Sequence, residues 1–86
     1  MITTNEATIV YNKKVFHIDE QKIIGQRLRQ AREARGLTLE QAAIAAGVTA
    51  HNIHCYEQGS LAPPDVLIKL VCEVYRCALL EILPGQ

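Results

Sequence analysis

The 86-residue chain has few of the features that mark membrane-bound, secreted or strongly charged proteins. No apolar run approaches the roughly 18 residues that a membrane-spanning helix needs. The first ten residues are polar and show no basic start followed by an apolar stretch, so we expect no secretory signal and a cytoplasmic location. Three cysteines, an odd number, are expected to stay reduced there. The formal net charge is zero, which argues against unspecific coating of nucleic acid, since that requires excess positive charge.

The chain also lacks the usual signatures of catalysis and metal binding. It has no glycine-rich phosphate loop, no Ser-His-Asp order that suggests a triad, and little volume for a pocket, so we predict no enzyme and no cofactor. His51, His54 and Cys55 follow a spacing that can converge on zinc. A fourth ligand is missing unless His17 supplies it, and paired Cys or His spacings are absent, so we predict no metal site. We interpret Cys72 and Cys77 as small core residues.

The chain is short and rich in apolar residues, and its first part has a different residue pattern from the rest. Hydrophobic residues make up 49% and charged residues 21% of the sequence, which is typical of one globular domain. Residues 8–11 and 15–18 are β-branched and aromatic runs around a polar turn, which indicates either a hairpin or one extended arm. We therefore divide the chain into an arm or hairpin at 1–18 and a helical domain at 19–86.

The remaining pattern predicts five helices. Asp19 has the chemistry of an N-cap, with Ile18 and Ile23 as a hydrophobic staple, and this first helix should stop at Gly36. Its apolar face is Ile24, Leu28 and Ala31. A fourth helix opens at Pro63-Pro64-Asp65, with Leu67, Ile68, Val71 and Val74 or Tyr75 as its buried stripe, and a last short helix covers about 78–83.

The second and third helices form the most informative unit, at residues 39–58. Thr38 and Gln41 match a capping box, and Thr49 is placed to cap the next helix after a turn of only three residues, 47–49. Gly47 can take a positive φ in that turn, and Ala43 is small where the two helices approach. With Ile53 filling the core between them, the second helix of the pair can project from the body and enter a major groove.

At this point the sequence resembles the Cro and lambda-repressor-like (XRE-type) helix-turn-helix family. The resemblance runs without gaps from about 23 to 83 and is carried by these residues: Ile24-Gly25, Leu28, Arg32, Gly36-Leu37-Thr38, Ala43, Gly47-Val48-Thr49, Ile53, Tyr56-Glu57, Gly59 and Pro63. It implies an all-α, five-helix lambda-repressor-like DNA-binding domain, here preceded by the short β-like arm or hairpin. It also implies a homodimeric, sequence-specific transcriptional regulator, in most cases a repressor, that binds double-stranded DNA.

The resemblance assigns roles to individual residues. It pairs Arg32 with Glu57 as an ion pair that links the first helix to the recognition helix, a geometry suited to the forked guanidinium. The base-facing residues that it implies are Thr49, Ala50, His51, Asn52, His54 and Cys55. Gln58 lies where a phosphate contact is common among similar proteins, and we add Arg27 and Arg29 of the arginine-rich first helix as further phosphate contacts.

Several positions depart from the family pattern. Leu39 replaces a polar residue, loop 60–62 is uncharged, and helix 49–58 contains no Lys or Arg. Ile44 stands where a charged residue is usual, so either the second helix is rotated and Ile44 fills a gap, or Leu39, Ile44 and Leu61 form an exposed apolar surface. The alternative function is therefore a protein-interaction module on the same fold, such as an antitoxin, with the N-terminal arm or this surface as the binding site.

Overall fold

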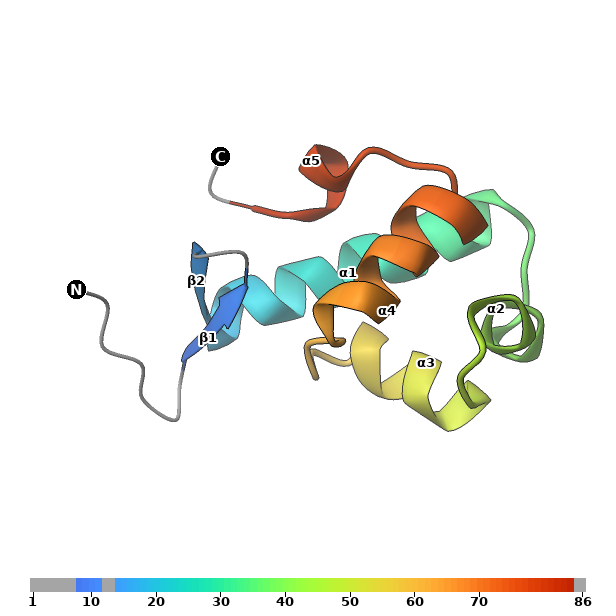
Figure 1. Cartoon of the computed structure of the whole chain (residues 1–86), viewed down its shortest axis with the longest axis horizontal. Coiled ribbons are helices and arrows are strands. Elements are labelled where there is room, and N and C mark those ends of the chain that lie inside the picture. Colours follow the sequence, from blue (N-terminus) through green and yellow to red (C-terminus); the bar gives the residue numbers. More distant parts are fainter. Residues whose placement is uncertain (1–7, 12–13, 85–86) are drawn as a thin grey trace.

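The computed structural model describes residues 8–11 and 14–84, with side chains described from Phe16 onward. The elements are β1 (Thr8–Tyr11), β2 (Lys14–His17), α1 (Ile18–Ala34), α2 (Leu39–Ala46), α3 (Ala50–Glu57), α4 (Pro64–Ile68), the π-helical segment η1 (Lys69–Val74) and α5 (Leu79–Ile82). Figure 1 shows α1 as the long central helix, with the hairpin at its start, α2 near its far end, α3 below it and α5 above it. The predicted all-α, five-helix fold is confirmed for the described residues.

The N-terminal strands form a hairpin and not a single extended arm. β1 pairs antiparallel with β2, and Thr8 lies opposite His17 and Ile9 opposite Phe16. A two-stranded hairpin is marginal alone, so it needs something to pack against. Phe16 supplies this contact, because its side chain is completely buried in the core of the helical bundle. The first seven residues of the predicted 1–18 arm and its turn at 12–13 lie outside the described residues.

The start of α1 corrects the predicted cap. The N-cap is His17 and not Asp19, and the His17 backbone N–H donates to Glu20 Oε1 at 3.1 Å. Ile18 is already helical and 49% exposed, so it does not form the predicted staple with Ile23. The physical reason is that Phe16 takes the buried position at the helix entry. The side chain of Gln21 then fixes the entry by donating to the Phe16 carbonyl at 3.2 Å in a buried site.

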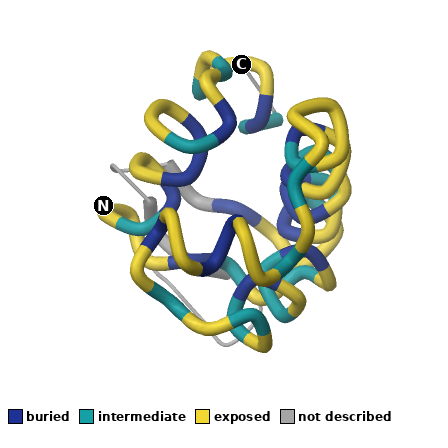
Figure 2. The backbone as a smooth tube through the Cα atoms, turned by 90° about the vertical axis from the view of Figure 1, so that its right-hand side faces the viewer, coloured by how far each residue is buried: buried dark blue, intermediate teal, exposed yellow. Residues whose placement is uncertain are grey.

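The core lies between α1 and the helices that cross it. Ile24, Leu28 and Ala31 of α1 are buried as predicted. Figure 2 shows the same division for the residues whose burial is described, with the buried segments of the backbone nearer the middle of the bundle and the exposed segments on the outside. The other buried hydrophobic residues of the described part are Phe16, Ala42, Ala43, Ala46, Ile53, Ala62, Leu67, Leu70, Val71, Tyr75 and Ile82.

The predicted stripe of the fourth helix is wrong at Ile68, and the separate prediction that Cys72 lies in the core is also wrong. The helix widens into η1, where the Tyr75 N–H donates to the Leu70 carbonyl, five residues back, at 2.7 Å. A π-helical turn aligns residues five apart, so Tyr75 joins Leu70 in the core. Ile68 is 39% exposed, and Cys72, predicted in the core, is also exposed.

Candidate nucleic-acid interface

Local hydrogen bonds fix the direction in which α3 leaves the turn. Gln41 N–H donates to Thr38 Oγ1 at 3.1 Å, and Thr38 N–H donates to Gln41 Oε1 at 2.9 Å, so the capping box of α2 is confirmed. Gly47 ends α2 with a φ of 75°, a conformation that favours glycine. Thr49 Oγ1 then accepts the Asn52 N–H at 3.0 Å and caps α3. In Figure 1, α2 is seen nearly end-on and α3 nearly side-on, so the two helices cross steeply.

Small side chains let α2 approach its neighbours closely. Ala42, Ala43 and Ala46 are all buried on the inner side of α2. Ile53, 1% exposed, is the main buried apolar side chain of α3. Because these residues occupy the inner faces, the remaining side chains of α3 are held on the outside.

The Arg32–Glu57 pair joins three parts of the chain. Arg32 Nε donates to Glu57 Oε2 at 2.7 Å and Arg32 Nη2 to Glu57 Oε1 at 3.1 Å, the two-pronged geometry in which a guanidinium matches a carboxylate. Arg32 Nη1 also donates to the Leu37 carbonyl at 2.8 Å. Hydrogen bonding to the Glu57 carboxylate, which accepts from the guanidinium, raises the pKa of Arg32. The pair therefore ties the end of α3 to α1 and to the loop before α2.

Gly25 allows the backbones of α1 and α3 to touch. A Cβ atom at this position would lie 2.5 Å from the Glu57 carbonyl oxygen and 2.8 Å from the Tyr56 carbonyl oxygen. Real Cβ atoms essentially never come so close to backbone atoms. From the sequence, Gly25 is recognisable only as one residue of the family pattern, because nothing in a single sequence shows which element a helical glycine faces.

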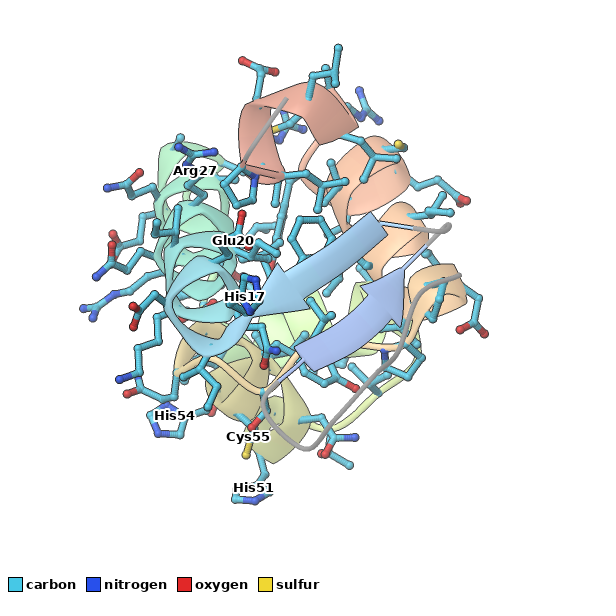
Figure 3. The ribbon with its side chains drawn as sticks, turned by 90° about the vertical axis from the view of Figure 1, so that its left-hand side faces the viewer. His17, Glu20, Arg27, His51, His54 and Cys55 are labelled. Carbon is cyan, nitrogen blue, oxygen red and sulfur yellow. The ribbon has the colours of Figure 1, made fainter. Side chains whose placement is uncertain are left out.

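The outward face of α3 carries most of the predicted base-facing residues. Thr49, His51 and His54 are exposed, and Asn52 and Cys55 are half-buried beside them. Figure 3 shows His51 and His54 projecting outward from α3, with Cys55 next to His51. The Cys55 Sγ and His51 Nε2 atoms are 3.5 Å apart. This face therefore offers several hydrogen-bonding groups and no formal charge from Lys, Arg, Asp or Glu.

Ala50 differs from the other predicted base-facing residues because it packs against the hydrophobic core. It is half-buried and packs against the hydrophobic core, as does Tyr56. Ala50 therefore has less surface available to a ligand than His51 or His54, which are exposed on the same helix.

The structure brings together only two of the three predicted phosphate contacts. Arg29 and Gln58 line one depression of about 360 Å³ between α1 and the end of α3, together with Lys22, Gln26 and Glu57. Arg27 lies elsewhere: its Nη1 donates to the Ile82 carbonyl at 3.4 Å, and Figure 3 shows it near α5, far along the molecule from His51.

Sequence reasoning missed Lys22 and Gln26, which share the depression with Arg29. A signal was available, since residues 22, 26 and 29 follow the i, i+4, i+7 spacing of one helix face. That spacing does not reveal which neighbour the face meets. The packing of α3 against α1 supplies this information.

The predicted apolar surface is reduced to one strongly exposed residue. Ile44 is 82% exposed, so the rotation of α2 that would bury it does not occur. The reason is that alanines already fill the inner face of α2. Leu39 and Leu61 are half-buried and pack against the core.

The described residues show neither a cluster of metal ligands nor a membrane-spanning helix. There, no group of three or more His, Cys, Asp or Glu side chains could hold a metal ion. His17 lies at the start of α1 beside Glu20 and not with His51 and Cys55 (Figure 3). In the same part of the chain, no helix has the length and apolar character to cross a membrane.

Comparison with known proteins gives one finding. The family model for a helix-turn-helix domain matches residues 23–82, which is most of the chain and includes α2, the turn and α3. No curated protein and no solved structure gives a significant match.

Proposed function

Because the chain belongs to the family of helix-turn-helix domains, a class of DNA-binding domain, we propose that it is a sequence-specific transcriptional regulator that inserts α3 into the major groove of DNA. The observation that carries this proposal is the division of α3 into two faces. Ile53 and Glu57 are buried against the protein. His51, His54 and the N-cap residue Thr49 are exposed. A helix held in this way presents a ridge of side chains to a groove.

The exposed side chains have the chemistry for base readout. An Asn side chain such as Asn52 can form two hydrogen bonds with adenine, and His51 and His54 can donate to guanine N7 or to a phosphate. Thr49 can bond to several bases, and the methyl group of Ala50 can contact a thymine methyl to the extent that the core leaves it accessible. Each good bidentate contact contributes about 1–3 kcal/mol of discrimination between bases.

We further propose that two copies bind together and repress transcription in the cytoplasm. Dimeric helix-turn-helix proteins place their two recognition helices about 34 Å apart, one turn of DNA. The operator is then an inverted repeat with half-sites one turn apart, and the bound dimer blocks access of RNA polymerase. Dimer formation also compensates for the absence of Lys and Arg on α3, because two modest half-site affinities act together.

Selection of bound duplexes from a random DNA pool tests this proposal directly. We expect a palindromic consensus, and recovery of unrelated sequences would contradict it. The double variant His51→Ala/Asn52→Ala should keep its helical circular dichroism and lose specific affinity by about 1–3 kcal/mol per bidentate contact. The matched control is Gln30→Ala, an exposed polar residue of α1, which should leave operator affinity unchanged.

A second function, binding of another protein, is favoured by Ile44. This isoleucine is 82% exposed on α2, next to a recognition helix that has no Lys or Arg. Binding to mixed genomic DNA distinguishes the two functions, since a DNA-binding protein loses affinity steeply as salt rises. If Ile44→Ser leaves DNA binding intact but removes a partner, the same fold performs both functions.

A further inference from the structure

The depression between α1 and the end of α3 has cations and amides on its walls. Lys22, Gln26 and Arg29 lie on one face of α1 and are exposed, and Gln58 faces them from the C-cap of α3. Lysine and arginine supply charged N–H donors, and each glutamine supplies an amide N–H₂ group. These are donors that phosphate oxygens accept from in protein–DNA complexes.

Two glycines hold the walls of this depression in place. Gly25 lets α1 contact the backbone of α3, as described above, and so sets Gln26 beside the end of α3. Gly59, with a φ of 114°, follows Gln58 and packs against Lys22, since a Cβ there would lie 3.2 Å from the Lys22 Cγ atom. The aliphatic part of Lys22 is therefore in contact with the loop that ends α3.

The charges around the depression leave it positive. The Glu57 carboxylate is one lining group, but both of its oxygens are engaged by Arg32. Arg29 pairs with Glu33 at 3.2 Å, yet both side chains are more than half exposed, and such surface pairs are weak and exchange easily. Lys22 and Arg29 thus remain available to an anion.

We propose that this depression receives one phosphate of the DNA backbone, with Lys22 and Gln26 acting together with Arg29 and Gln58. The inference rests on the proposed DNA-binding function and extends it to residues that the sequence did not indicate. Gln58 lies one helical turn after His54, so the site continues the outward face of α3 and faces the wall of the groove that this helix enters. It also supplies the positive charge that α3 itself lacks.

The test is the salt dependence of DNA binding by the variant Lys22→Gln/Arg29→Gln. Losing one phosphate contact lowers the slope of log Kobs against log salt by about 0.9. Between about 50 and 200 mM salt, the variant should therefore lose roughly threefold less affinity than the wild type. The effect should be equal on the selected operator and on mixed genomic DNA, because a phosphate contact carries no sequence information.

A charge-matched control separates the site from the general loss of positive charge. Lys69→Gln/Arg76→Gln removes the same charge at exposed positions that do not line the depression, and its slope should equal that of the wild type. Equal slopes for the two double variants would overturn the inference. Thermal unfolding confirms that each variant is folded. A single variant, Gln26→Glu, adds a carboxylate to the depression and should weaken binding to all duplexes.

The outcomes distinguish this inference from the proposed function. If the wild type binds DNA and Lys22→Gln/Arg29→Gln leaves its salt slope unchanged, the phosphate site is refuted while DNA binding stands. If the wild type binds no duplex, both fail. A separate titration uses inorganic phosphate without DNA and follows the side-chain amide NMR signals of Gln26 and Gln58. Saturation of these signals in the submillimolar range would make a free anion the ligand and overturn the assignment to DNA.

Discussion

Substitution of Gly25 by alanine tests how the candidate interface is held on the bundle. The new methyl group would meet the Glu57 carbonyl oxygen at 2.5 Å, the Glu57 carbonyl carbon at 2.8 Å and the Tyr56 carbonyl oxygen at 2.8 Å. These are backbone atoms of α3, so the clash is relieved only if α3 moves away from α1. Such a movement also stretches the Arg32–Glu57 ion pair, which spans the same two helices.

Two opposing effects set the magnitude. Crowding in a packed interior costs about 1–3 kcal/mol, and the upper part of that range applies because rigid backbone is in the way. Alanine favours the helix over glycine by about 1 kcal/mol, which offsets part of the cost. We therefore expect Gly25→Ala to lower the free energy of unfolding by about 2 kcal/mol. For a domain of this size, that corresponds to a fall in Tm of roughly 8–16 °C.

Chemical denaturation and thermal unfolding of Gly25→Ala measure this change. Gln30→Ala on the exposed side of α1 serves as the control for helix propensity and should shift stability by only a few tenths of a kcal/mol. If Gly25→Ala is as stable as the wild type or more stable, the close contact between α1 and α3 does not exist in solution, and the argument for the position of α3 fails.

Three further predictions address the buried polar groups and the cysteines. Glu57→Gln leaves a nearly buried guanidinium without its carboxylate and should lower the free energy of unfolding by about 3 kcal/mol; an unchanged denaturation midpoint would show that the pair contributes nothing. The Tyr75 hydroxyl is buried and has no hydrogen-bond partner among the described residues, so Tyr75→Phe should stabilise the protein by about 1 kcal/mol. Burial also raises the pKa of Tyr75 from 10.0 to about 12, so its contribution to stability is complete below pH 10 and lost as the pH rises toward 12. A wild-type alkaline decline no steeper than that of the variant would contradict this. Alkylation of Cys55 by N-ethylmaleimide in a Cys72→Ser background should abolish DNA binding. Adding Cys55→Ser to this background should make DNA binding resistant to the reagent. Cys77 should react slowly in both variants, because burial raises the pKa of its thiol.

The helix caps and the turn between α2 and α3 could be predicted from the sequence. The capping box of Thr38 and Gln41, the positive φ of Gly47 and the cap formed by Thr49 all depend on groups within a few residues of one another. Hydrogen bonds across so short a distance are decided by residue type and spacing, so a single sequence contains the information. The match of residues 23–82 to the helix-turn-helix family agrees with this prediction.

Predictions from the sequence were wrong for residues whose surroundings depend on distant parts of the chain. His17 caps α1 in place of Asp19 because Phe16 enters the core, and the π-helical turn of η1 buries Tyr75 more deeply than Val74. Neither effect follows from local periodicity. Both depend on which apolar side chain the rest of the bundle has room to bury.

The candidate site shows the same division. Residue types and spacing alone determined that this chain forms a helix-turn-helix unit whose second helix has no Lys or Arg. Only the tertiary structure decided that Arg29 lies beside Gln58 while Arg27 bonds to α5, and that Lys22 joins the former group. The physical reason is that a helix turns by about 100° per residue, so neighbouring arginines point to different sides, and only the packing of α1 against α3 and α5 determines what lies on each side.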